Sequence, residues 1–285
     1  MAGTLFVVAT PIGNLEDITV RALRVLREVA LIAAEDTRRT SHLLARHAIA
    51  TPTTSLHEHN EAAKSASLVA RLQRGESIAL VSDAGTPTVS DPGKRLIREA
   101  IDAGIRIEAV PGPSAVLAAL AASGLPTESF TFLGFPPTRS KDRTEWFERA
   151  RQVAGTIVFF EAPHRINRTL QELGRLLVKR HIHVHREISK IHEEYVKRPN
   201  NSDNRPMPEA GEFVVVVEPA NQADSDASLS ADHLSLATRL IEYLTNKESL
   251  DHSAAEEMAA KALSVEPRDM RKALKKARIR QRQQE

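Results

Sequence analysis

Four short segments rich in Gly, Pro, Ser, Thr and Asp each follow an apolar run, and these residue types can bind ligands through backbone groups and small polar side chains. The segments span residues 10–15, 35–40, 82–93 and 111–114. If the apolar runs are parallel strands, the segments lie at the carboxyl ends of those strands, where open α/β sheets bind ligands. The pattern therefore predicts one pocket built from four strand exits.

The first segment, Thr10-Pro11-Ile12-Gly13-Asn14-Leu15, stands where a nucleotide-binding glycine loop would be, but it holds a single glycine. It matches neither GxGxxG nor GK[ST], which disfavours a dinucleotide dehydrogenase and a P-loop enzyme. Pro11 and Gly13 still permit a tight turn whose backbone approaches a ligand closely.

The second segment begins with two acids, Glu35 and Asp36. Acids at this place in dinucleotide folds bind a ribose. Alternatively, they cap the next helix and pair with Arg38 and Arg39, and we expect at least one of them to act as a cap.

The third and fourth segments combine rigid and small residues. SDAGTP and SDPG join two turns within residues 82–93, which is more than a connection between two elements requires, so we interpret this segment as shaping a ligand site. In the fourth segment, Ser114 can cap the following helix. Capping does not explain the Pro-Gly-Pro that precedes Ser114.

The elements that must position these segments alternate between strand and helix. Strands are predicted at residues 4–9, 31–34, 78–82, 105–110, 130–133, 156–160, 182–186 and 212–218, and helices at 17–29 with Asp17 as cap, 40–47, 62–73, 93–103, 115–122, 141–153 and 166–177. This order is typical of an α/β fold whose largely parallel sheet carries helices on both faces.

Two changes in composition divide the chain. Ser123-Gly124-Leu125-Pro126 separates a first lobe, residues 1–122, from a second lobe, residues 123–219. Residues 220–285 are predicted to be an acidic linker followed by helices at 234–244, 254–263 and 269–280. The last helix is basic, and it could meet phosphates or simply be a solvated charged helix.

Composition excludes several classes of protein. The 285 residues are 41% hydrophobic and 27% charged with a net charge of +2, which is ordinary for a globular chain of two domains. Without cysteine, no disulfide framework, thiolate zinc site or cysteine nucleophile is possible. The start of the chain has the pattern of a first strand, not of a signal peptide. The sequence has no run of about 18 apolar residues, so no membrane span is predicted. We therefore expect a cytoplasmic protein.

His181, His183 and His185 alternate, so a strand would place them on one face, as metal ligands can be. No acid falls in this pattern, and we interpret the three as solvent-facing histidines. His192-Glu193 lacks the second histidine of HExxH, so no zinc protease site and no metal site are predicted.

At this point the motifs resemble a known family. VATPIGNLEDIT, AEDTRRTSHLL, ALVSDAGTPTVSDPG, VPGPSA, EAPHRI and REISKIHEE stand in the order found in the bacterial ribosomal RNA small-subunit methyltransferase I family, of the tetrapyrrole-methylase fold group, the class III methyltransferases. The resemblance covers residues 5 to about 219. It implies a two-lobed subunit with S-adenosylmethionine in the cleft between the lobes, and a C-terminal helical appendage lies outside it.

The resemblance also implies an activity and a site. Members of the family form homodimers and transfer a methyl group to the ribose 2′-hydroxyl of a cytidine in small-subunit (16S) rRNA. The substrate is either the free rRNA or the 30S particle. Transferred by position, the cofactor-binding residues are Pro11, Gly13, Asp83, Gly85, Thr86, Ser114, Ala115, Glu161 and Ala162. Asp83 stands where related enzymes have a Gly-Asp-Pro turn, and this chain has Ser-Asp-Ala there.

A ribose hydroxyl is a weak nucleophile, so a base or a cation that eases its deprotonation would help. On an extended chain over residues 186–194, Glu187 and Lys190 lie on opposite faces. Lys190 could lower the pKa of the hydroxyl, and Glu187 could accept its proton. The alternative is an ion-pair cluster at the surface.

Contacts with RNA would use basic side chains near the mouth of the cleft. The candidates are Arg38, Arg39, Arg139, Lys141, Arg143 and Arg165. Two other functions stay open: methylation of a tetrapyrrole or other small molecule by the same fold, and RNA binding without catalysis.

Overall fold

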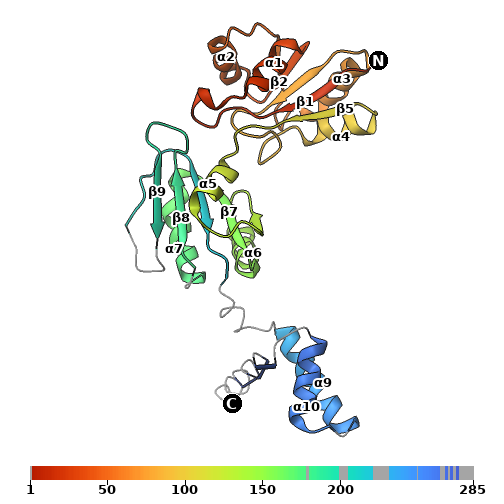
Figure 1. The fold of residues 1–285 in the computed structure, drawn as a ribbon, viewed down its shortest axis with the longest axis vertical. Coiled ribbons are helices and arrows are strands. Elements are labelled where there is room, and N and C mark those ends of the chain that lie inside the picture. The colour runs from red at the N-terminus through yellow and green to blue at the C-terminus, as the bar shows by residue number, and fades with distance from the viewer. Residues whose placement is uncertain are drawn as a thin grey trace. The chain divides into compact units, whose positions relative to one another are not determined.

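The computed structural model describes residues 2–177, 180–198, 205–220, 231–248, 250–263, 267–268, 270–271 and 274–275. The chain forms two compact units, Met1–Glu218 and Pro219–Glu285 (Figure 1). The polar, proline-bounded sequence of residues 200–208 predicts a mobile loop, and this segment lies partly outside the described residues. The linker at 221–230 lies wholly outside them.

The first lobe of the larger unit is built on a parallel sheet. Its strands run in the order β3-β2-β4-β1-β5. They are β1 (Thr4–Val8), β2 (Leu31–Ala34), β3 (Thr53–Ser55), β4 (Ile78–Val81) and β5 (Arg106–Val110). All four neighbouring pairs are parallel, as the alternation of elements predicted. Strand β3 was missed because its sequence, Thr-Thr-Ser, is short and polar.

Helices cover both faces of this sheet (Figure 1). They are α1 (Val20–Glu28), α2 (Thr37–Arg46), α3 (Glu61–Gln73) and α4 (Lys94–Asp102). Ile32 packs with the apolar side chains of α1 and α2, and its neighbour Leu31 packs with those of α3 and α4. Every residue of β2 and β4 is therefore buried, as expected of a strand between two helix layers.

The first helix begins later than the sequence suggested. Thr19 caps α1 by accepting a hydrogen bond from the backbone of Ala22, and Asp17 ends a short 3-10 turn, η1 (Leu15–Asp17). The prediction that Asp17 caps this helix was therefore wrong. Asp17 and Thr19 can both cap a helix, and in the structure Thr19 does so.

The second lobe has a mixed sheet in the order β6-β7-β10-β8-β9. Its strands are β6 (Phe130–Phe132), β7 (Thr156–Glu161), β8 (Ile182–Arg186), β9 (Glu194–Arg198) and β10 (Phe213–Val217). Only β6 and β7 pair in parallel, and the other pairs are antiparallel. Strand β9 was missed because residues 186–194 were interpreted as one extended stretch.

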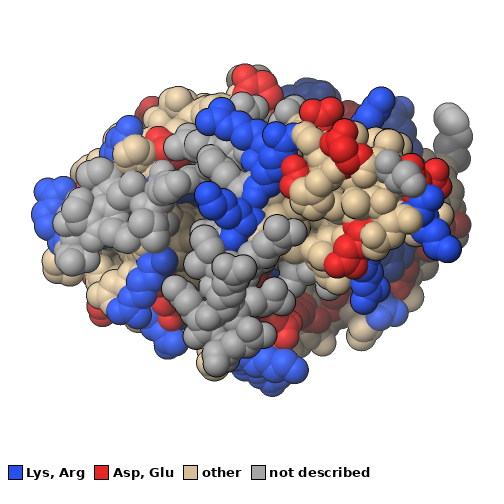
Figure 2. All heavy atoms as spheres, turned by 90° about the horizontal axis from the view of Figure 1, so that it is seen from below, with Lys and Arg blue, Asp and Glu red and all other residues tan. Residues whose placement is uncertain are grey.

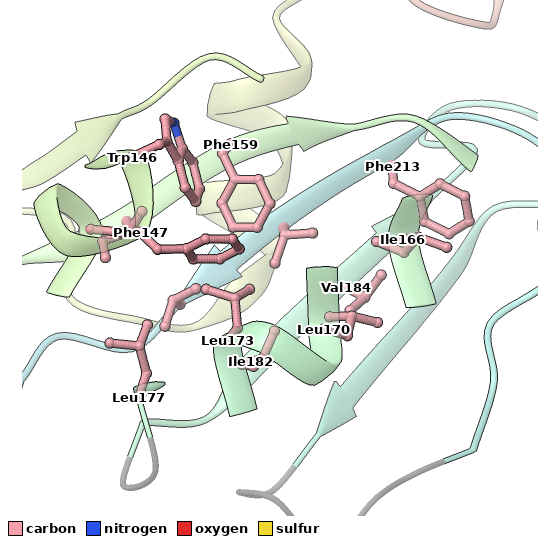
Figure 3. Close-up of a cluster of buried hydrophobic side chains, with 14 of the residues drawn as sticks. Trp146, Phe147, Phe159, Ile166, Leu170, Leu173, Leu177, Ile182, Val184 and Phe213 are labelled. Atoms are coloured by element: carbon pink, nitrogen blue, oxygen red, sulfur yellow. The ribbon is translucent and has the colours of Figure 1, made fainter. Parts of the chain in front are cut away.

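Two helices, α6 (Ser140–Gln152) and α7 (Ile166–Leu176), pack on one face of this sheet. In Figure 3, Trp146 and Phe147 of α6 lie against Phe159 of β7. The Trp146 ring centroid is 5.1 Å from that of Phe147 and 5.2 Å from that of Phe159. The three aromatic rings make this core dense although aromatic residues are rare in the chain.

The opposite face of the second sheet is covered by α5 (Ala115–Ser123), whose Val116 and Leu120 pack with Val158 and Val216. The sequence grouped this helix with the first lobe. By packing, it belongs with the second sheet, so the segment 111–114 is the one that crosses from one lobe to the other.

The smaller unit contains α9 (Ala231–Lys247) and α10 (His252–Ala262), and Asp251 caps α10 by accepting from the backbone of Ala254 at 2.9 Å. Its core includes Ile241, Ala259 and Met270. Most of the third predicted helix, 269–280, lies outside the described residues. None of the described helices is long and apolar enough to cross a membrane.

Candidate active site

Three of the four strand exits that the sequence predicted to form one pocket converge, and the fourth, residues 35–40, does not line the cavity described below. Thr10 and Gly85 exchange backbone hydrogen bonds of 2.9 and 3.0 Å, which fastens the exit of β1 to that of β4. The Thr86 hydroxyl donates to the carbonyl of Pro113 at 3.3 Å, which adds the exit of β5. Gly85 has φ +81°, a conformation that glycine adopts without strain.

A cavity of about 410 Å³ opens beside these loops and extends to the second lobe. The residues that line it are Ile12, Ala84, Gly85, Thr86, Val89, Ser90, Asp91, Ser114, Ala115, Val116, Phe135, Phe160, Glu161, Ala162, Pro163, Ile188, Gly211, Glu212, Phe213 and Val214. This volume lies within the range of small-molecule and cofactor sites.

Six of the nine residues assigned to the cofactor by resemblance line this cavity. They are Gly85, Thr86, Ser114, Ala115, Glu161 and Ala162. The other three, Pro11, Gly13 and Asp83, do not line it. The side chain of Ser114 caps α5 by accepting from Leu117, as the sequence suggested.

Asp83 fastens the exit of β2 to that of β4. Its Oδ1 accepts from the backbone N–H of Asp36 at 2.9 Å, and its own N–H donates to Glu35 at 3.3 Å. Arg39 lies 3.4 Å from its other oxygen. With both oxygens occupied in this way, Asp83 shapes the loops that carry the cavity, without lining it.

Of the two acids after β2, Asp36 caps α2 by accepting from the backbone of Arg38 at 2.8 Å. The expectation that at least one of them caps is therefore confirmed. Hydrogen bonds from the Arg38 side chain and backbone hold the pKa of Asp36 far below its usual value. Burial raises the pKa of Glu35, with the Asp83 backbone bond opposing the rise and the Asp83 charge adding to it.

Asp91 is an acid of the cavity wall that was not among the predicted site residues. Burial, together with the nearby charges of Glu35 and Asp83, raises its pKa to about 6. A hydrogen bond from Ser82 lowers the pKa and so opposes part of this rise. Its motif, SDPG, belongs to the segment that the sequence predicted to shape a ligand site, but Asp91 itself was not assigned to the cofactor. The same segment holds Thr88 and Ser90 at φ 73° and 69°, where non-glycine residues are strained.

Residues 187–193 form a turn between β8 and β9, not an extended stretch, so the prediction that Glu187 and Lys190 lie on opposite faces of a strand was wrong. Glu187 and Ser189 both have positive φ, 55° and 68°. The turn is stabilised from two sides, because Glu212 donates its backbone N–H to Glu187 at 2.8 Å and Ser189 donates to Glu193 at 2.8 Å.

The turn brings Lys190 between two carboxylates. Its Nζ lies 2.9 Å from Glu187 and 3.1 Å from Glu212, a residue of the cavity wall. The hydrogen bond from Lys190 lowers the pKa of Glu187. Burial alone would lower the pKa of Lys190, but its bonds with Glu187 and Glu212 raise it overall.

Gly13 lies where the two lobes meet. A Cβ at this position would be 2.5 Å from Cγ of Lys190 and 2.9 Å from the carbonyl oxygen of Ile188. The Ser189 hydroxyl also donates to the carboxylate of Asp17. Glycine is therefore required at residue 13 for close approach of the Lys190 turn.

The carboxylate of Glu161 is occupied by partners within the second lobe, although the residue contributes to the cavity wall. It is fully buried and accepts from the backbone of Ala162 at 2.7 Å and from the hydroxyl of Thr169 at 2.5 Å. Arg165 lies at 2.7 Å and Arg143 at 4.0 Å. A buried charge requires partners of this kind, and together they fix the end of β7.

The basic residues predicted to contact RNA divide into two groups. Arg143 is 4% exposed and pairs with Glu172 at 2.6 Å, so its guanidinium is not available to a phosphate. Arg165 is largely buried behind Glu161. Spacing along α6 could not show this, because the burial comes from α7. The exposed candidates are Arg38, Arg39, Arg139 and Lys141.

The alternating histidines do not all face solvent, so that interpretation was wrong for two of them. His183 and His185 are buried, and the Tyr195 hydroxyl lies 2.8 Å from Nδ1 of His183. Burial lowers the pKa of both, that of His185 to about 4. His181 pairs with Glu218 at 2.5 Å. Among the described residues, no group of three His, Cys, Asp or Glu side chains could hold a metal ion.

Comparison with known proteins identifies the family of this chain. A model described as Tetrapyrrole (Corrin/Porphyrin) Methylases matches residues 4–201. The ribosomal RNA small subunit methyltransferase I of Halalkalibacterium halodurans is 47% identical over 219 residues, 76% of each chain. That of Xylella fastidiosa is 43% identical over 267 residues, 90% of this chain and 94% of the relative. The chain belongs to the ribosomal RNA small subunit methyltransferase I family of tetrapyrrole methylases.

A solved structure shares the fold of this family. Uroporphyrin-III C-methyltransferase from Thermus thermophilus, complexed with S-adenosyl homocysteine, matches 76% of this chain and 97% of its own with a TM-score of 0.53. At 18% identity this likeness establishes the fold alone. The predicted two-lobed class III methyltransferase fold is confirmed.

Proposed function

We propose that this chain transfers the methyl group of S-adenosylmethionine to the ribose 2′-hydroxyl of a cytidine in small-subunit (16S) rRNA. The observation that carries the proposal is the convergence of six residues assigned by resemblance on one cavity of about 410 Å³. On the same resemblance we propose a homodimer that acts in the cytoplasm, on free rRNA or on the 30S particle.

The residues of the cavity suit S-adenosylmethionine. Small and apolar side chains such as Ala84, Val89 and Ala115 offer space for flat and aliphatic groups, and Asp91 offers a negative charge for a cationic ligand. Gly85, Thr86 and Ser114 would hold the cofactor from the first lobe and α5, and Ala162 from the second lobe. When bound, S-adenosylmethionine supplies an electrophilic methyl carbon on its sulfonium.

The protein's contribution is to hold the hydroxyl oxygen in line with that carbon, which can supply roughly 7–11 kcal/mol of the barrier. Lys190 is the cation proposed to ease deprotonation of the hydroxyl. Its raised pKa keeps it protonated at neutral pH. We also propose that Glu187 chiefly positions Lys190, because its lowered pKa makes it a weaker proton acceptor.

The experiment is a methyl-transfer assay with the purified chain and labelled S-adenosylmethionine. The substrates are 30S particles from cells that lack the gene, free 16S rRNA, and a porphyrin. Label on a cytidine ribose of the rRNA supports the proposal, and ribose-methylation mapping of rRNA from cells with and without the gene locates the site. Label in the porphyrin alone would contradict it, as would failure to bind the cofactor at millimolar concentration.

A further inference from the structure

We propose that Phe135 is a stacking platform for a nucleobase. The residue is 49% exposed and lines the cavity. Its ring rests at 5.4 Å, tilted by 56°, on the ring of Phe160, another residue of the cavity wall, and Phe160 rests on Phe132 at 5.0 Å. A phenylalanine held half in water forfeits part of the stabilisation that full burial would give it. Such a ring at the wall of a ligand cavity is explained by a ligand that covers it.

The backbone around Phe135 is fixed by hydrogen bonds on both sides. The carbonyl of Gly134 accepts from Phe160 at 2.8 Å, and that of Leu133 accepts from the indole of Trp146 at 3.1 Å. After Phe135, the carbonyl of Pro136 accepts from Arg165 at 2.9 Å. The ring is therefore presented by a rigid segment.

The arginine that fixes this segment also binds the buried carboxylate of Glu161. Arg165 lies 2.7 Å from Glu161, and Arg143, which donates to the carbonyl of Pro137 at 3.3 Å, belongs to the same cluster. Two of the arginines predicted to contact RNA thus hold the backbone that follows Phe135. A preorganised ring loses little conformational freedom when a ligand stacks on it, which favours binding.

The chemistry of the surroundings points to a nucleobase. Exposed Arg139 and Lys141 follow Phe135 within six residues along the chain. Aromatic faces combined with basic side chains are how proteins hold unpaired nucleotides, with stacking on the ring and phosphates on the cations. This inference rests on the proposed function, since both the cofactor and the substrate carry a base. The half-exposed ring and its basic neighbours favour the base of the RNA over the adenine of the cofactor.

The test uses the full chain with Phe135→Leu, Phe135→Trp and, as matched control, Phe130→Leu, because Phe130 is 39% exposed and does not line the cavity. Stacking contributes about 1–3 kcal/mol per base, or roughly 5-fold to 150-fold in binding. We expect Phe135→Leu to lower kcat/KM for 30S particles by about 5-fold or more, with the Kd for S-adenosylhomocysteine within about 2-fold of wild type. Phe135→Trp restores the rate, and Phe130→Leu matches wild type.

A loss confined to S-adenosylhomocysteine binding would also support the platform and would identify the base as adenine. Unchanged RNA and cofactor parameters in Phe135→Leu, or a loss that Phe135→Trp does not restore, would overturn it.

Tryptophan fluorescence of Phe135→Trp gives a readout independent of activity, with Phe130→Trp as control. If the wild type methylates no RNA, the proposed function fails. In that case the platform still stands or falls on quenching by S-adenosylhomocysteine or 16S rRNA.

Discussion

Lys190 is the residue whose surroundings decide whether the turn after β8 has a chemical role. Two carboxylates within 3.1 Å keep it charged, and its turn abuts Gly13 of the first lobe. A solvated surface pair would need neither the positive φ of Glu187 nor a glycine opposite it. The contacts therefore favour the electrostatic role over the surface ion-pair cluster.

Replacing Lys190 by Met should lower the rate of methyl transfer by about 10²-fold to 10³-fold, the usual cost of removing one electrostatic group from a transition state. Lys190→Arg should retain part of the rate because the charge stays. The Kd for S-adenosylhomocysteine should change by less than about 3-fold, because Lys190 does not line the cavity. Single-turnover rates at saturating cofactor test this, and a wild-type rate in Lys190→Met would favour the surface pair.

Asp91 gives a prediction for the pH dependence of stability. Its pKa is raised from 3.8 to about 6 by burial and neighbouring charges, so the folded protein binds this proton more tightly than the unfolded chain does. The stabilisation from this group is complete below pH 3.8 and is lost as pH rises through 6. Asp91→Asn should therefore stabilise the protein at pH 8.

Because Asp91 is partly exposed, solvent screening reduces the gain to on the order of 1 kcal/mol. Thermal unfolding of wild type and Asp91→Asn at several pH values measures it. The difference should shrink as pH falls through 6 and vanish near pH 4. A constant difference across pH would mean that the carboxylate is not the cause. The same variant should bind cationic S-adenosylmethionine more weakly, with less effect on S-adenosylhomocysteine, which lacks the sulfonium charge.

Arg143 of α6 is buried and Arg139, the residue before α6, is exposed, so the two should differ in effect. Arg143→Met leaves Glu161 and Glu172 short of a partner and should lower the free energy of unfolding by about 3 kcal/mol or more. Arg139→Met should change it by less than about 0.5 kcal/mol, weaken RNA binding and reduce its salt dependence by about one unit of slope.

Urea unfolding and RNA binding at several salt concentrations separate the two effects on α6. Equal stability losses in the two variants would contradict this division. So would a loss of RNA binding by Arg143→Met at a temperature where the variant is fully folded.

At the scale of elements, the features predicted correctly are those that depend on apolar periodicity and on the residues that form turns. The parallel first sheet, its covering helices and the meeting of the exits near Thr10, Gly85 and Thr86 followed from apolar runs and Gly and Pro positions. The features that were missed depend on contacts between distant segments. Arg143 is buried because of α7, and the pKa of Asp91 depends first on its burial and then on the charge of Glu35.

Strand β9 shows the same limit. Its sequence, EYVKR, carries three charges in five residues and follows a turn whose hydrogen bonds come from residues 193 and 212. Without these partners, residues 186–194 were indistinguishable from one extended stretch. His183 and His185 were taken as exposed for a related reason, because Tyr195, which covers them, comes from that strand.

At the scale of the whole molecule, the overall charge gives little indication of where RNA would bind. The net charge is only +2, and in Figure 2 basic and acidic side chains are interspersed over the face shown. The concentration of charge is instead in the sequence of the smaller unit. From Arg268 to Glu285 there are eight Lys or Arg residues and two acids, Asp269 and Glu285. If RNA binding has a long-range electrostatic component, this segment is its main source.

The two compact units have separate hydrophobic cores, so they should be separable by truncation. A chain that ends at Ala220 should fold and bind S-adenosylhomocysteine within about 2-fold of the full chain, because every residue that lines the cavity lies before it. Its affinity for 16S rRNA should fall. The slope of log affinity against log salt should decrease by about 2 or more, since each lost phosphate contact removes about 0.7 on single strands.

Titrations of RNA at several salt concentrations, with cofactor binding measured by calorimetry, test the truncation. A full-length variant in which the basic residues after Arg271 are replaced by Gln is the matched control, because it keeps the length of the chain and removes six of the eight basic charges. If both chains bind RNA with the salt slope of the wild type, the tail is a solvated charged helix. If the truncated chain alone loses affinity while the Gln variant does not, the smaller unit contributes through its fold and not through its charge.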